Sequence, residues 1–260
     1  MLEDDFTYVL RKALIRRSLA PAQAAQRAGL PVNDVLAFLR GTFSHAIARQ
    51  LAPVLGLDAA AFAQHATYQP APQSHPGIAR LDLPFGDDRV NAWLVSAGDA
   101  SVLFDAGFQP SDLLGALKAP GTRFPARVFI THGHHDHTGA LQHLLATGIP
   151  VHGAAIPGTL AMQPGDVVCC SPLTVRACDL SGHATPALGF HIDGLAQPVL
   201  VTGDALFAGS IGGCGSPTIY QHALCRLHEV LDTLPDATVL LPGHGPATTL
   251  GEERAANPFL

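Results

Sequence analysis

Apolar residues in the first quarter of the chain recur at the three- and four-residue spacing of amphipathic helices. The first buried stripe comprises Phe6, Val9, Leu10, Ala13 and Leu14. Later helix boundaries are marked by prolines that a first helical turn tolerates and by glycines that end a helix, at Pro21, Gly29, Pro31 and Gly41. A fifth short helix is expected over 59–65, with Asp58 as its N-cap. The pattern therefore predicts a small all-α domain over residues 1–67.

The pattern changes after residue 67. Three prolines stand among Gln, Ser and Gly and disfavour both helix and sheet, which predicts a linker over 68–78. Beyond the linker, apolar runs with β character alternate with helical stretches. Strands are expected over 79–83, 91–96, 101–104 and 127–130, and helices over 112–118 and 139–146. This alternation predicts a layered α/β domain over residues 79–260.

Composition is that of a folded globular protein. With 260 residues, 47% of them hydrophobic, the chain can bury a large core in one or two domains. Uninterrupted apolar stretches stay well below the ~20 residues of a membrane span, and the N-terminus has no apolar signal region, so we expect a cytoplasmic protein. The five cysteines lack CxxC spacing, which argues against a disulfide framework and predicts that most are small core residues.

Residues 132–137 hold four histidines and one aspartate in six consecutive positions, directly after the apolar run 128–130. Imidazole and carboxylate groups are ligands that suit zinc and iron, and a strand end holds their directions rigidly. A solvated histidine loop is the alternative, but crowded histidines repel one another when protonated, whereas a cation stabilises the same cluster. The segment predicts a metal site.

Three later segments each offer one further ligand beside glycine, after a β-like run. They carry His183, Asp204 and His244. Singly, such residues are ordinary turn formers. In this order, the HxHxDH motif at 132–137 and the three later residues resemble the metallo-β-lactamase superfamily.

The resemblance implies an αββα sandwich: two mixed sheets packed face to face, helices outside, and metals at one edge. It gives His132, His134 and His183 to one metal, Asp136, His137 and His244 to a second, and Asp204 to both. His135 fills the variable position of the motif. Asp105 matches an aspartate that orients ligands by hydrogen bonding, and Asp136 and Asp105 are the residues expected to act in catalysis. Two divalent ions are expected, with zinc favoured and iron or manganese as alternatives.

The segments 204–212, 242–254 and 257–260 are similar to the short bacterial glyoxalase II-like hydrolases, which lack the C-terminal glutathione-binding helices of their longer relatives. Those relatives usually continue past the position of Gly212 with Arg, a small hydroxyl residue and an acid, whereas this chain has Gly213, Cys214 and Gly215. Residues 71–260 carry eight basic against sixteen acidic side chains. This excess of acidic side chains argues against a nucleic-acid substrate. Few basic side chains are left to hold the two carboxylates of glutathione, so we expect glutathione thioesters to be poor substrates.

The resemblance implies hydrolysis of a small-molecule thioester by a hydroxide shared between two cations. The first alternative is an iron-dependent persulfide dioxygenase with a similar motif. The second is a metabolite-responsive, DNA-binding regulator that retains a metallo-hydrolase domain.

The five N-terminal helices, with 24–30 leading into 31–40, look like a helix-turn-helix domain of the phage-repressor type. Within 31–40, Asn33 and Arg40 would favour DNA contact and Asp34 would oppose it. Residues 1–70 hold seven Lys and Arg against five Asp and Glu, which is weakly basic for a DNA-binding domain. A bundle that forms a homodimer or covers the catalytic domain is the other interpretation. Because the expected ligands all follow Ile130, we expect the metal site to remain competent without residues 1–67.

Overall fold

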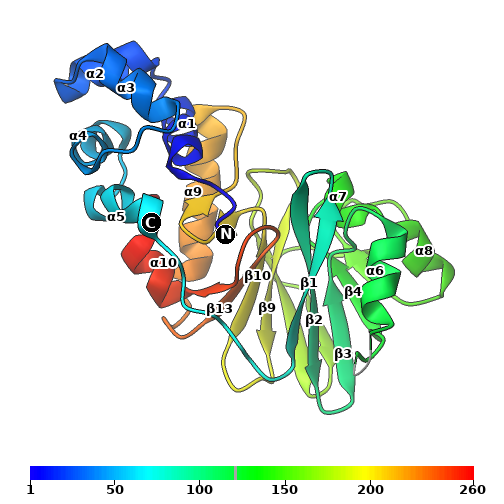
Figure 1. The fold of residues 1–260 in the computed structure, drawn as a ribbon. Coiled ribbons are helices and arrows are strands. Elements are labelled where there is room, and N and C mark those ends of the chain that lie inside the picture. Colours follow the sequence, from blue (N-terminus) through cyan, green and yellow to red (C-terminus); the bar gives the residue numbers. More distant parts are fainter. Residues whose placement is uncertain (120–121) are drawn as a thin grey trace.

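The computed structural model describes residues 1–119 and 122–260. Within these residues the main strands form two six-stranded sheets that pack against each other, with helices on both outer sides (Figure 1). This layering confirms the expected αββα sandwich and the helical region that precedes it. A short hairpin pairs β11 (Leu206–Phe207) with β12 (Ser210–Ile211) outside the two sheets.

The first sheet runs in chain order from β1 to β6. Its strands are β1 (Ile78–Phe85), β2 (Asp88–Ala97), β3 (Ala100–Phe104), β4 (Arg127–Ile130), β5 (Val151–Gly153) and β6 (Leu160–Ala161). The first three are antiparallel, and β3 to β6 run parallel to one another. The chain therefore leaves β3 and β4 at the same edge of the sheet.

The second sheet has the order β14-β13-β10-β9-β8-β7. Its strands are β7 (Val167–Cys170), β8 (Leu173–Asp179), β9 (Leu188–Asp193), β10 (Val199–Gly203), β13 (Val239–Pro242) and β14 (Thr248–Thr249). Only β10 and β13 pair in parallel among these strands. Their carboxyl ends consequently lie side by side, and each continues into a loop that carries an expected ligand.

Apolar side chains between the sheets form one core, in which the rings of Phe104, Phe129 and Phe190 lie 5.3–5.5 Å apart. A second core lies beneath α6 (Pro110–Leu117) and α8 (Leu141–Ala146) on the outer face of the first sheet. These two cores fix the strands whose ends carry the ligands.

The N-terminal helices are α1 (Phe6–Arg16), α2 (Pro21–Ala28), α3 (Val32–Leu39), α4 (His45–Leu55) and α5 (Ala59–Gln64), followed by a 3-10 turn at His65–Thr67. The Asp58 side chain accepts from the Ala61 amide at 2.7 Å, which confirms the predicted N-cap. Gly29 ends α2 in the left-handed conformation at φ 66°, as expected. Pro31 precedes α3 as its cap and is not its first residue.

These helices share a core with the outer face of the second sheet. Phe38 and Phe62 belong to the same apolar cluster as Leu206 and Tyr220. The cluster also includes side chains of α9 (Pro217–Leu231) and α10 (Leu250–Ala256), which lie beside the N-terminal helices in Figure 1. Residues 68–75 are irregular and dock against the sandwich, since Tyr68 Oη donates to Glu253 at 2.8 Å.

The helix expected over 139–146 is present as α8, and a further helical turn that the sequence did not indicate, α7 (His135–Thr138), lies within the motif. Gly139 lies between α7 and α8, where a Cβ would be 1.8 Å from the Phe108 carbonyl oxygen. All five cysteines are free thiols, but only Cys214 among them is buried, so the expectation that most are core residues is wrong. None of the helices in the described part of the chain is long and apolar enough to cross a bilayer.

Candidate metal centre

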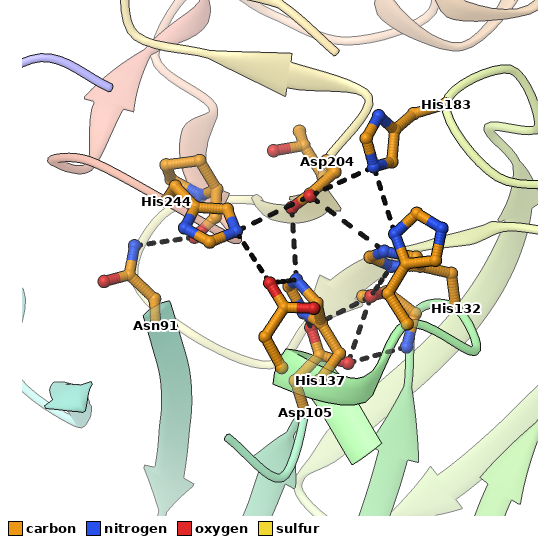
Figure 2. A network of polar contacts seen from close by, with 12 residues as sticks. Asn91, Asp105, His132, His137, His183, Asp204 and His244 are labelled. Atoms are coloured by element: carbon orange, nitrogen blue, oxygen red, sulfur yellow. Dashed lines mark hydrogen bonds and ion pairs between the residues drawn. The ribbon is translucent and has the colours of Figure 1, made fainter. Parts of the chain in front are cut away.

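The expected ligands converge at one edge of the sandwich (Figure 2). His132 follows β4, Asp204 follows β10 and His244 follows β13, so the ends of three strands aim these side chains inward. Asp136 and His137 come from the single turn α7, and His183 comes from the loop after β8. His135 is exposed and packs edge-on against Phe108, as expected for the variable position of the motif.

Four ligand atoms form the first group, from His132, His134, His183 and Asp204, and lie within 4.8 Å of one another. His183 Nε2 is 3.1 Å from His134 Nδ1 and 3.5 Å from Asp204 Oδ2. Two nitrogens that share a tetrahedral zinc at 2.0–2.1 Å lie about 3.3 Å apart. The spacing of this group therefore fits one cation.

Asp136, His137 and His244 form the second group. The Asp136 carboxylate lies 3.3 Å from His244 Nε2 and 3.5 Å from His137 Nε2. Asp204 connects the two groups, because its Oδ1 is 3.3 Å from His137 Nε2 and its Oδ2 is 3.6 Å from His244 Nε2. The two groups together offer the ligands of two neighbouring ions that share one carboxylate.

In four of these histidines, the ring nitrogen Nδ1 points away from the centre and contacts another group of the protein. Nδ1 of His137 lies 2.8 Å from Asp105, and Nδ1 of His132 lies 3.0 Å from the Thr131 hydroxyl. Backbone carbonyls accept from the other two, Arg89 from His244 at 2.7 Å and Gly213 from His183 at 2.9 Å. These contacts direct the Nε2 atoms toward the centre, as in metal sites where a partner fixes the imidazole tautomer.

Comparison with known sequences agrees with this geometry. Residues 85–175 match the profile of the Metallo-beta-lactamase superfamily. The chain is 27% identical over 208 residues to the probable metallo-hydrolase YqgX of Bacillus subtilis (strain 168), covering 68% of this chain and 95% of that protein. It is 29% identical over 201 residues to hydroxyacylglutathione hydrolase GloC of Haemophilus influenzae, covering 67% and 89%.

Solved structures share the architecture. The B3 metallo-β-lactamase BLEG-1 superposes with a TM-score of 0.60 at 27% identity, over 70% of this chain and 99% of that one. The chain has the metallo-β-lactamase fold. TTHA1623, solved in a di-iron-bound form, gives a TM-score of 0.56 at 29% identity over 69% and 99%. ETHE1 from Myxococcus xanthus gives 0.56 at 25% identity over 70% and 83%.

Asp105 holds two residues at the edge of the sandwich where the expected ligands converge. It is 2% exposed and has a left-handed backbone, with φ 62°, directly after β3. Its carboxylate accepts from the Thr131 amide at 2.8 Å as well as contacting His137. The strained conformation, costly for a residue other than glycine, is consistent with a role in fixing the ligands.

Sequence reasoning missed Asn91, which holds the loop around His244. The Asn91 amide donates to the carbonyls of Pro242 and Gly245, both at 2.9 Å, and its backbone N–H donates to Gly243 at 2.7 Å. Gly243 leaves room for the centre, because a Cβ there would be 2.1 Å from Asp204 Oδ1. The signal in the sequence is a single polar residue within the apolar run of β2.

Glu3 is a second residue that the sequence did not indicate. Its carboxylate lies 4.0 Å from His244 Nδ1, although 241 positions separate the two along the chain. The N-terminal segment therefore reaches the edge of the candidate metal centre, on the outward side of His244.

Charges at the centre favour a cation. Burial and then the neighbouring His137 lower the pKa of His132 to about 3. Burial also opposes protonation of His244, but hydrogen bonds to Asp136 and Asp204 raise its pKa to about 10. Among the described residues, His132 Nε2, His137 Nε2 and Asp204 Oδ1 are buried without a hydrogen-bond partner. Divalent ions would pair these inward-facing atoms, so the residues present fit a metal centre.

Proposed function

We propose that this chain is a metal-dependent hydrolase that holds two divalent cations and cleaves a thioester. The observation that carries the proposal is the position of Asp204, whose two carboxylate oxygens lie 3.3–3.6 Å from histidines of both ligand groups. We propose His132, His134, His183 and Asp204 for one ion and Asp136, His137, His244 and Asp204 for the other. Zinc is the first candidate ion, and iron is the second because TTHA1623 was solved with two irons.

Bound divalent ions would supply a nucleophile at neutral pH by lowering the pKa of bound water to about 7, and would polarise a carbonyl oxygen. The protein's own groups provide the geometry for this chemistry. Asp105 and the two backbone carbonyls hold the imidazoles in fixed orientations before the substrate arrives. His134 is exposed and the His183 side chain is 26% exposed, so a substrate can approach from their side.

A thioester matches this ligand set because a thiol leaves readily. With an ordinary thiol pKa near ~8.5, the departing thiolate needs little help from a general acid. The similarity to hydroxyacylglutathione hydrolase GloC supports the same class of substrate.

The thiol part is expected to differ from glutathione. Lys12 reaches the loop at Ile211, close to the position where glyoxalase II-like hydrolases usually carry an arginine, but its ammonium is bound to Asp4 and to the Ile211 carbonyl at 2.7 Å. A cation already paired in this way is poorly placed to hold the carboxylates of glutathione.

The test is a thioester panel run on protein purified without added metal, together with metal analysis of the same sample. We expect about two ions per chain and a higher kcat/KM for small neutral thioesters than for S-lactoylglutathione. Each missing charged hydrogen bond to glutathione would cost roughly 1.5–3 kcal/mol of transition-state binding. A clear preference for S-lactoylglutathione would instead make the chain an ordinary glyoxalase II.

A second candidate is an iron-dependent persulfide dioxygenase. The first ligand group contains two histidines and one carboxylate, His132, His134 and Asp204, and this set of ligands suits a single non-haem iron. The fold similarity to ETHE1 from Myxococcus xanthus agrees with this alternative. Oxygen consumption with glutathione persulfide, and one iron per chain, would favour it over the hydrolase.

The domain division at 67 and 79, DNA contact by 31–40 and formation of a homodimer stay predictions from sequence. We propose residues 79–260 as the part that holds every metal ligand.

A further inference from the structure

The hairpin of β11 and β12 lies between one expected ligand and the carbonyl group that holds another. It begins two residues after Asp204 and ends two residues before Gly213, whose carbonyl oxygen accepts from His183 Nδ1 at 2.9 Å. The Gly212 amide closes the base of the hairpin by donating to the Ala205 carbonyl at 3.2 Å. A Cβ at Gly212 would lie 1.9 Å from the Asp204 carbonyl oxygen and 2.9 Å from His183 Cβ. A displacement of the hairpin would therefore disturb the surroundings of both ligands.

The N-terminal helical region holds this hairpin through a buried ion pair. The Lys12 ammonium pairs with the Asp4 carboxylate, and the two side chains are 13% and 7% exposed. Lys12 also donates to the Ile211 carbonyl at 2.7 Å, and the Ser210 hydroxyl donates to Asp4. The ammonium lies 5.3 Å from the centre of the Phe207 ring, within the range of cation–π attraction. The pair therefore contacts both strands of the hairpin.

This ion pair is not needed to join the helical region to the sandwich. Apolar side chains of the N-terminal helices, α9 and α10 already form a core that the two regions share. Burying two charges is costly unless each is paired and hydrogen-bonded, so such a pair contributes little net stability. Hydrogen bonds depend on distance and angle, however, and those from Lys12 and to Asp4 restrict where the hairpin can lie. The pair therefore suits a role in positioning.

We propose that Lys12 is a positioning residue for the metal centre: it fixes the hairpin through Ile211, and the hairpin fixes His183 and Asp204. This role rests on the proposed metal centre and gives the N-terminal helical region a part in it. The expected ligands all follow Ile130, so a chain without residues 1–67 is still expected to bind metal, but more weakly.

The experiment titrates cobalt(II) into metal-free full-length protein and follows the visible absorption, which reports both affinity and the arrangement of the ligands. Lys12→Met keeps an unbranched side chain and removes the ammonium. We expect the affinity of one cobalt ion to fall about tenfold, the lower end of what loss of an orienting residue costs, and the absorption bands to change. Arg16→Met is the matched control, because Arg16 also lies on α1 but donates to the Gly56 carbonyl, at 3.1 Å within the helical region.

A change of charge and a change of position have opposite effects on cobalt binding. Lys12→Met removes a positive charge near the centre, which by itself would strengthen the binding of a cation. Lys12→Met combined with Asp4→Asn leaves the net charge unchanged and no buried carboxylate unpaired, so this double variant should fold even where the single variant does not. Its cobalt affinity should fall by the same factor, because the Ile211 carbonyl again lacks the Lys12 ammonium as a donor.

Hydrogen exchange of the proteins as purified follows the hairpin directly. Exchange over 204–213 should be faster in both Lys12 variants than in wild type, whereas exchange over 132–137 should be unchanged. The role of Lys12 is overturned if both variants keep the cobalt affinity and spectrum of wild type, or if Arg16→Met alters them equally. In those cases the metal centre stands. If wild type itself binds no cobalt, the metal centre fails and the role of Lys12 fails with it.

Discussion

The N-terminal helices and the sandwich bury their side chains in different ways. The sandwich has one core between its sheets and another beneath α6 and α8, both built from residues after Ile78. The helices of residues 1–67 instead complete a core that they share with α9, α10 and the second sheet. The edge of the sandwich that carries the expected metal ligands is therefore supported by cores within the sandwich itself. The helical region, in contrast, depends on the sandwich for its packing.

The largest expected effect tests the ligand edge alone. Asp204→Asn keeps the shape of the side chain but removes the charge shared by both ligand groups. Loss of a residue that merely orients a ligand costs 10- to 100-fold, so we expect roughly a thousandfold or greater loss of activity and loss of bound metal. Elemental analysis and turnover measure both.

The helical circular dichroism signal of Asp204→Asn should persist, because the shared core is untouched. Asp99→Asn, at an exposed turn, is the matched control and should behave as wild type. Full metal content and turnover in Asp204→Asn would remove the residue from the centre.

A second substitution tests whether the two regions unfold as one unit. Phe62 is fully buried in the shared core, and Phe62→Ala should lower the free energy of unfolding by about 3–5 kcal/mol. Trp93, the single tryptophan, reports on β2 in the sandwich, while far-ultraviolet circular dichroism follows the helices. Both transitions should shift together; a shift in the helical signal alone would show two independent units. Phe124→Ala, at an exposed ring, should leave stability nearly unchanged.

Asp105→Asn tests the support beneath the ligands. Asparagine is uncharged and its side-chain nitrogen cannot accept a hydrogen bond, so one of the contacts to Thr131 and His137 is lost. We therefore expect metal affinity to fall about 10- to 100-fold. Competition with a chelator measures this affinity. An unchanged affinity would mean that the strained backbone at Asp105 serves the turn and not the metal.

The smallest effect concerns the joint between the regions. Burial lowers the pKa of His65, so the folded protein holds this imidazole neutral. As pH falls below ~6.5, the imidazole is protonated in the unfolded chain before it is protonated in the folded one, and this lowers the free energy of unfolding. The loss is at most about 1.4 kcal/mol at pH 5.5, and it is absent well above pH 6.5. His65→Gln should flatten this part of the stability profile between pH 7.5 and 5.5. Identical profiles for metal-loaded wild type and variant would contradict it.

The sequence predicted the ligand edge well because neighbouring residues determine it. The motif at 132–137 carries four ligands on one strand end and one helical turn, and glycine marks the turns that bear His183, Asp204 and His244. The structure brings these seven side chains together in two adjoining groups. Their roles as metal ligands await the metal analysis described above.

Contacts between residues far apart in the sequence could not be predicted from local sequence patterns. Glu3 beside His244 and Asn91 beneath Gly243 depend on packing between segments more than 150 positions apart. That the metal site remains competent without residues 1–67 stays a prediction. Removal of these residues would expose apolar side chains of α9 in the shared core, so we expect the shortened chain to be less stable.

The end of the chain is packed onto its beginning. The Asp58 amide, at the cap of α5, donates to the Pro258 carbonyl at 2.8 Å, and Phe259 belongs to the shared core. During synthesis the N-terminal helices leave the ribosome before residues 206–259, which complete their core. These helices therefore stay partly unburied until that later segment has emerged and folded.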